Sequence, residues 1–161
     1  AAVELDPRDL DDEKIAAFDA AGFTRASLGV QSTDPRVQKA INRIQPAPTV
    51  TRTVERLRAA GFTSINIDLV YGLPRQDEST FARTLAETIA LMPDRFAVFN
   101  FAHVPWMKPV QKLIRPDDLP SPEVKIRLLL MSMERLAEAG YRHIGLDHFA
   151  RPDDPLAVAW R

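Results

Sequence analysis

The sequence predicts an α/β fold in which parallel strands alternate with helices that pack outside them. Three segments end in nearly the same way, with two residues, a glycine and an aromatic residue, at positions 20–23, 59–62 and 138–141. Glycine there accepts the left-handed conformation that ends a helix, and the aromatic residue packs back on the last turn. The second and third of these glycines are about twice as far apart in the sequence as the first and second. A further helix ending is therefore expected midway between them, and Pro93 ends a helix there. A recurring strand–helix unit follows, as in parallel α/β proteins.

Each of these endings leads into an extended stretch, and a further stretch precedes the first. We expect strands at 3–5, 25–31, 64–71, 96–102 and 142–146. We expect helices at 11–21, 35–42, 49–60, 79–91 and 121–139. The last helix has a good start, because Ser121 can cap it and Pro122 suits its first position.

The faces of the strands indicate a barrel rather than a flat sheet. In 64–71, apolar and mainly polar residues alternate, which places Asn66 and Asp68 on the face opposite the apolar one. A doubly wound sheet needs apolar residues on both faces, because helices cover both. We therefore predict a partial (β/α)6 barrel with a polar interior. The expected inward positions near the strand ends, where barrels build their sites, are Glu4, Gln31, Asp68 and Ala102.

Composition allows one core and excludes several functions. The 161 residues are 45% hydrophobic, and the formal net charge of −1 gives no field that favours nucleic acid. No apolar run is long enough for a membrane span, and no signal peptide is visible, so we expect a cytoplasmic monomer. Cysteine is absent, which excludes disulfides and a thiolate-held metal within these residues. The chain begins inside a strand-like stretch without Met, so we expect a fragment.

Five short segments carry a resemblance to a known family. They are Gly29-Val30-Gln31, Asn42-Arg43, the stretch 66–74 (NIDLVYGLP), the stretch 101–105 (FAHVP) and the stretch 145–154 (GLDHFARPDD). Together they resemble the oxygen-independent coproporphyrinogen III oxidases, S-adenosylmethionine radical enzymes of anaerobic haem synthesis. The resemblance runs over residues 3–161. It implies that 1–161 is the C-terminal portion of the radical S-adenosylmethionine barrel, with about 141–161 starting the following segment.

The resemblance assigns cofactor roles to the inward residues. It implies that Glu4 contacts an S-adenosylmethionine bound to a [4Fe–4S] cluster. It implies that Gln31, Arg43, Asp68 and the backbone around Ala102 form a second S-adenosylmethionine site. The cysteines that hold the cluster in the family lie in a motif upstream of this chain, so no metal ligand is expected here. Ile44 departs from the family, where a polar residue is expected.

Each of these positions also has a plainer interpretation. Glu4 can be a strand-end carboxylate in solvent, and Arg43 a surface arginine. Asp68 is the sharpest position, because a charge on an otherwise apolar strand is costly unless it is paired. The turn 148–154 is expected over the open end of the barrel, with Arg151 and His148 contacting substrate. Alternatively, Arg151 pairs with Asp153 or Asp154 and only shapes the turn.

The function that the resemblance implies is oxidative decarboxylation of two propionates of coproporphyrinogen III to vinyl groups, giving protoporphyrinogen IX. The chemistry would be that of a 5′-deoxyadenosyl radical, with an electron donor of unknown identity. A haem-trafficking relative is the first alternative, although such proteins lack the segment 148–154. A barrel hydrolase that uses Glu4 and Asp68 as a carboxylate pair and a pure binding or scaffold fragment are the others.

Overall fold

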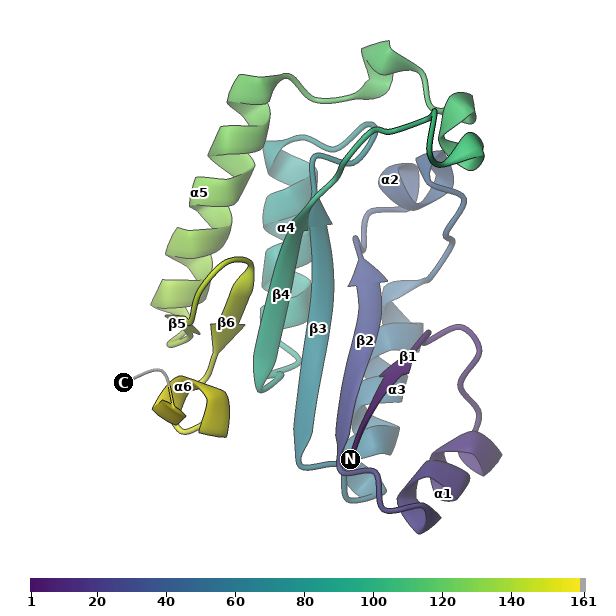
Figure 1. The fold of residues 1–161 in the computed structure, drawn as a ribbon, viewed down its shortest axis with the longest axis vertical. Coiled ribbons are helices and arrows are strands. Elements are labelled where there is room, and N and C mark those ends of the chain that lie inside the picture. The colour runs from purple at the N-terminus through teal and green to yellow at the C-terminus, as the bar shows by residue number, and fades with distance from the viewer. Residues whose placement is uncertain (160–161) are drawn as a thin grey trace.

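The computed structural model describes residues 1–159 as a six-stranded sheet with helices on one side (Figure 1). The strands are β1 (Ala2–Leu5), β2 (Arg25–Gln31), β3 (Ser64–Tyr71), β4 (Arg95–Asn100), β5 (Arg142–His143) and β6 (His148–Ala150). The helices are α1 (Asp12–Ala20), α2 (Pro35–Ala40), α3 (Ala47–Ala59), α4 (Glu78–Ile89), α5 (Pro122–Glu138) and α6 (Pro155–Ala159). Two short 3-10 helices, η1 (Pro109–Leu113) and η2 (Pro116–Asp118), lie between β4 and α5. No helix within residues 1–159 has the length and apolar character needed to cross a membrane.

The repeated helix endings form as predicted. Gly22, Gly61 and Gly140 have φ of +78°, +90° and +87°. In each case the amide after the glycine donates back to a carbonyl in the last turn, as from Phe62 to Leu57 at 3.0 Å. These bonds pair carbonyls that would otherwise be orphaned at a helix end. At the fourth position, Met92 rather than a glycine adopts positive φ, at +49°, just before Pro93.

Four parallel strands, β1 to β4, lie in chain order. Their apolar face packs against α3, α4 and α5, and the first two of these lie behind the sheet in Figure 1. The core residues of β3 on this face are Ile65, Ile67 and Leu69, which are completely buried. The alternation read from the sequence is therefore confirmed along β3. The opposite face carries the polar residues and is not covered by a helix of the part that the structure describes.

The expected single strand 142–146 is wrong. β5 ends at His143, and Gly145 and Leu146 turn the chain with φ of +108° and +47°. β6 then runs antiparallel between β4 and β5, pairing Phe149 with both Phe96 and His143. Two consecutive residues with positive φ reverse an extended chain, so a hairpin replaces the fifth parallel strand.

Asp94 ties the helical layer to the sheet and to this hairpin. Its Oδ2 accepts from Arg58 Nη2 at 2.6 Å and from the Ile65 amide at 2.7 Å, while its carbonyl accepts from the Arg151 amide at 3.0 Å. One half-buried side chain thus satisfies a helix cation and the amide of a central strand.

Replacing Asp94 by Ala should weaken the contact between α3 and β3. The Ile65 amide and Arg58 would lose their acceptor, which costs about 1–3 kcal/mol for buried partners. Native-state hydrogen exchange at the Ile65 amide should become faster, by the factor that corresponds to this loss of free energy. The exposed Asp153→Ala serves as control and should leave exchange at Ile65 unchanged; equal acceleration in both variants would contradict the assignment.

Candidate functional site

A row of polar side chains crosses the uncovered face of the sheet at β2 and β3. The strand register places Ser27 beside Asn66 and Gly29 beside Asp68. Ser27 Oγ donates to Asp68 Oδ2 at 3.0 Å, and Asn66 Nδ2 donates to Asp68 Oδ1 at 2.6 Å. Asn66 Nδ2 also lies 2.8 Å from Ser27 Oγ. Three residues from two strands therefore hold one carboxylate in a fixed orientation.

Asp68 is a partly buried carboxylate without a paired cation among residues 1–159. Burial raises the pKa of Asp68 above its ordinary value, and the charge of Glu4 adds to the rise. Hydrogen bonds from Ser27 and Asn66, and the charge of His148, act in the opposite direction. Asp68 forms no salt bridge with any residue of 1–159, and Asn66 Oδ1 is buried without a hydrogen-bond partner. The site therefore presents acceptors and invites a ligand that carries donors or positive charge.

Glu4 and His148 face the same region. Glu4 is aligned with Ser27 in the register of β1 and β2, and His148 is opposite Ala97, which is itself beside Asp68. Glu4, Ser27, Asn66 and His148 line one open pocket of about 420 Å³, together with Arg25, Ser64 and Arg95 from the amino ends of β2, β3 and β4. The structure thus brings Glu4, Asp68 and His148 into one region of the uncovered face.

Gln31 and Arg43 lie at the carboxyl end of β2, next to this row. Arg43 Nη2 donates to the Gly29 carbonyl at 2.6 Å, and Arg43 Nη1 lies 2.9 Å from Asp6 Oδ2. Its Nε is buried without a partner. Arg43 is therefore a positioned, mostly buried residue rather than a surface arginine, and it keeps one donor for a ligand.

Gly29 has a different role from the one expected. The sequence indicates that its missing side chain leaves room for a ligand. A Cβ at Gly29 would instead lie 3.0 Å from Gln31 Nε2 and 3.3 Å from Arg43 Nη2. The space is filled by these two side chains, which reach back over Gly29 because Gln31 adopts φ of +65° at an irregularity in the strand pairing.

Asp6, two residues after Glu4, holds Arg43 in place. Its carboxylate accepts from Arg8 Nη2 at 2.7 Å as well as pairing with Arg43. The hydrogen bond from Arg8, aided by the charge of Arg43, lowers the pKa of Asp6 to about 2. The Asp6 carboxylate therefore stays ionised and holds Arg43 at neutral pH.

The prediction that Ala102 is an inward residue at the end of a strand is wrong. Ala97 and Phe99 lie beside Asp68 and Val70, whereas Val98 is buried in the helical core. β4 ends at Asn100, so Ala102 belongs to the following loop, where its carbonyl accepts from Gln111 Nε2 at 3.1 Å. Both faces of β4 carry apolar side chains, which left the alternation ambiguous.

Arg151 is not brought to the carboxyl ends of the strands. It lines a pocket with Arg25, Ser64 and Arg95, which lie at the amino ends of β2, β3 and β4. Because β6 runs antiparallel to β4, the chain leaves β6 at the amino end of β4. The turn that follows therefore does not cover Gln31 and Ala102. The expected internal pair is also absent among residues 1–159, because Asp154 bonds Arg95 at 2.8 Å instead of Arg151.

Lys125 was not singled out by its sequence. From α5 it passes over Gly72, where a Cβ would lie 2.8 Å from its Cε, and its Nζ donates to the Phe101 carbonyl at 3.2 Å. The only sequence signal is the turn at Gly72, which the side chain of Gln76 holds with a 2.7 Å bond to the Gly72 amide.

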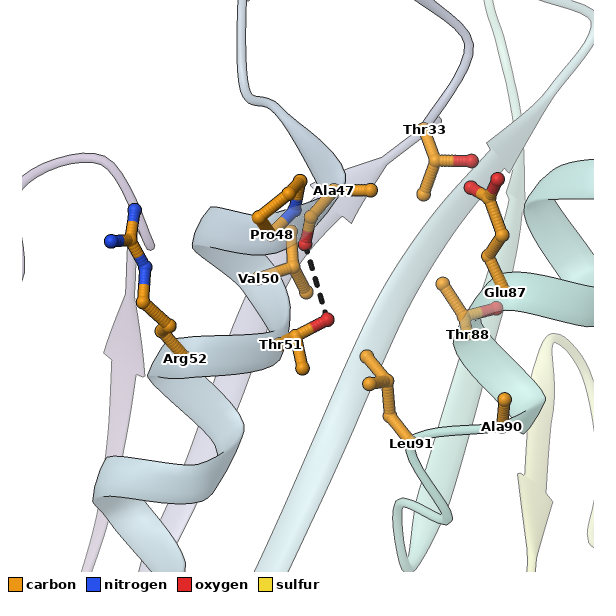
Figure 2. A pocket seen from close by; sticks show the side chains of 10 residues that line it. All are labelled: Thr33, Ala47, Pro48, Val50, Thr51, Arg52, Glu87, Thr88, Ala90 and Leu91. Carbon is orange, nitrogen blue, oxygen red and sulfur yellow. Dashed lines mark hydrogen bonds between the residues drawn. The ribbon is translucent and has the colours of Figure 1, made fainter.

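Figure 2 shows a second pocket, of about 550 Å³, on the helical side of the molecule between α3 and α4. Val50, Thr88 and Leu91 are among its lining residues, and in the figure Arg52 points away from the other labelled side chains. It offers apolar surface without converging polar groups. The uncovered face of the sheet is therefore the better candidate site.

Comparisons with known proteins identify the superfamily to which the chain is similar. The family model of the radical SAM superfamily matches residues 2–87, which include β1 to β3. An oxygen-independent coproporphyrinogen III oxidase of Pseudomonas aeruginosa is 53% identical over 98% of this chain and 34% of its own length. The one from Synechocystis is 47% identical over 99% of this chain and 34% of its own length.

Solved structures give the same picture. The coproporphyrinogen III oxidase of Escherichia coli, described as a radical SAM enzyme, superposes with a TM-score of 0.95 at 45% identity. This match covers 98% of the chain and 36% of that structure. A radical S-adenosylmethionine methyltransferase from Kitasatospora setae, at 16% identity and a TM-score of 0.59, shares the fold alone. The chain spans about a third of the length of the curated relatives it matches, and it belongs to the radical SAM superfamily.

Proposed function

We propose that this chain is part of an oxygen-independent coproporphyrinogen III oxidase. The observation that carries the proposal is the identity of about half of all residues with proteins of that name across 98% of the chain. In the proposed reaction each of two propionate side chains of the substrate loses CO₂ and a hydride equivalent and becomes a vinyl group. The haem-trafficking alternative has no comparable support among these relatives.

The residues on the uncovered face fit S-adenosylmethionine. This ligand has an ammonium group, a sulfonium centre and a ribose diol, all of which suit acceptors rather than cations. Glu4, Asp68 and the unpartnered Asn66 Oδ1 supply acceptors on one face. When bound and reduced by an iron–sulfur cluster, S-adenosylmethionine supplies a radical that abstracts hydrogen, while the protein orients the partners and excludes water.

Two S-adenosylmethionine sites are part of the proposal. Glu4 would bind the ligand that serves the cluster. Gln31, Arg43, Asp68 and the backbone around Ala102 would bind the second, with the free Nε of Arg43 directed to a carboxylate. His148 would contact the substrate from β6. Arg151 is left out of this proposal, because it lines a neighbouring pocket at the amino ends of the strands, away from Gln31 and Ala102.

The cluster would be held by residues outside this chain. The sequence has no cysteine, and residues 1–159 contain no cluster of three or more His, Asp or Glu suited to a metal ion. The parent enzyme is proposed to be a cytoplasmic monomer that receives its electron from a donor of unknown identity.

The first test concerns iron. Anaerobically reconstituted parent protein should bind iron and sulfide in equal amounts, while the 161-residue chain treated identically should bind none, because it lacks thiolates. Iron and sulfide assays with absorption spectra provide the measurement. A cluster-bearing preparation of the 161-residue chain would contradict the proposal.

The second test concerns Asp68 in the parent protein. Asp68→Ala should weaken S-adenosylmethionine binding by about 10- to 100-fold, since a hydrogen bond to a charged group contributes about 1.5–3 kcal/mol. Titration calorimetry gives the affinity and stoichiometry, with the exposed Asp153→Ala as a matched control. Unchanged affinity and stoichiometry in Asp68→Ala would remove Asp68 from the site.

The pH dependence of binding provides a third test. Because burial raises the pKa of Asp68, protonation competes with a cationic ligand, and affinity should rise as pH increases through that raised pKa. The Asp68→Asn variant cannot titrate there and should lose this part of the pH dependence. The same slope in both proteins would assign it to another group.

A further inference from the structure

The segment 101–121, between β4 and α5, forms an arch above the carboxyl ends of the strands (Figure 1). It leaves the top of β4, passes to the neighbourhood of α2 and returns to α5. Two bonds fasten it to the β3–α4 loop region: the Phe101 amide donates to the Tyr71 carbonyl at 2.8 Å, and the Arg75 amide to the Asp118 carbonyl at 2.6 Å. The arch therefore lies at the carboxyl ends of the strands, the end of β2 at which Gln31 stands.

The arch has a fixed shape. The side chain of Gln111 accepts from the Val104 amide at 2.6 Å and donates to the Ala102 carbonyl at 3.1 Å. The His103 ring lies 3.2 Å from the Gln111 carbonyl and stacks on Phe101. One glutamine thus closes the loop on itself, and the surface that the arch presents is preformed.

This ordered segment exposes large apolar side chains. The exposed fractions are 75% for Trp106, 69% for Met107, 78% for Val110 and 86% for Leu113. These side chains contribute almost nothing to the core, although hydrogen bonds hold the arch in a fixed shape. Grouped exposed apolar residues of this kind mark a binding surface.

Cations are interleaved with these apolar residues. Lys108, Lys112 and Arg115 are exposed on the same segment. Within residues 1–159 the two lysines form no salt bridge, and Arg115 has only a 3.9 Å contact with Asp117. A cleft of about 270 Å³ beside the arch adds Lys39 of α2 to the same region.

We propose that the arch binds the macrocycle and the carboxylates of a tetrapyrrole that carries several propionate groups. Exposed apolar side chains interleaved with cations are complementary to a broad apolar ring that carries carboxylates. This inference rests on the proposed function and extends it, because it assigns substrate recognition to residues outside the cofactor row. Occupation of the arch by a second copy of the chain, or by another segment of the parent protein, is a separate outcome of the test below.

The test uses the parent protein under anaerobic conditions. Single variants Lys108→Gln, Lys112→Gln and Arg115→Gln should each raise KM for coproporphyrinogen III up to about fivefold, as exposed ion pairs do. The triple variant should raise it up to about a hundredfold, with little change in kcat. Trp106→Ala should also raise KM, and Trp106→Phe should restore it in part. Arg52→Gln, on the outer face of α3, is the matched control and should behave as the parent does.

A second readout separates this inference from the proposed function. Coproporphyrin III, a stable oxidised tetracarboxylate, is titrated by fluorescence into the parent protein and the triple variant. Weaker binding in the triple variant, with S-adenosylmethionine affinity unchanged, supports the arch even if no turnover occurs, in which case the proposed function alone fails. Equal KM and equal coproporphyrin affinity in both proteins overturn the arch proposal. A change in oligomeric state of the triple variant would overturn it too, by marking the arch as an interface.

Discussion

The parallel register between β2 and β3 is the constraint on which the rest depends. It sets Ser27 beside Asn66 and Gly29 beside Asp68, so that two strands share one carboxylate. A shift of one residue would turn Ile67 to the uncovered face and Asp68 into the helical core. The fully buried apolar residues of β3 prevent such a shift, because they have no other place to pack. Core packing and site geometry are therefore fixed by one alignment.

The sequence predicts this arrangement wherever a single local pattern determines the backbone conformation or the buried face. The glycine endings of the helices and the alternation along β3 are of this kind, because they follow from backbone sterics and burial. The hairpin at Gly145 and the faces of β4 were misassigned for two physical reasons. Positive φ at Leu146 has no local signature, and β4 is apolar on both faces. The contacts of Arg43 with Asp6 and of Lys125 with Phe101 join elements distant in the chain, and only the fold brings them together.

Arg43 and the acceptors of the site differ in whether they are already paired. Arg43, at the carboxyl end of β2, is already held by Asp6 and by the Gly29 carbonyl. The acceptors of Asp68 and Asn66 remain available, held in place by neutral donors that do not cancel their charge. The carboxylate of Asp68 favours a ligand that carries positive charge or hydrogen-bond donors.

Lys125 connects two elements that are remote in sequence. Its side chain occupies the space that any Cβ at position 72 would need, and it bonds the carbonyl at the start of the arch. A larger residue at 72 would displace the lysine, and a shorter residue at 125 would leave the carbonyl of Phe101 without its donor. A change at position 72 is therefore transmitted through Lys125 to the start of the arch, some thirty residues further along the chain.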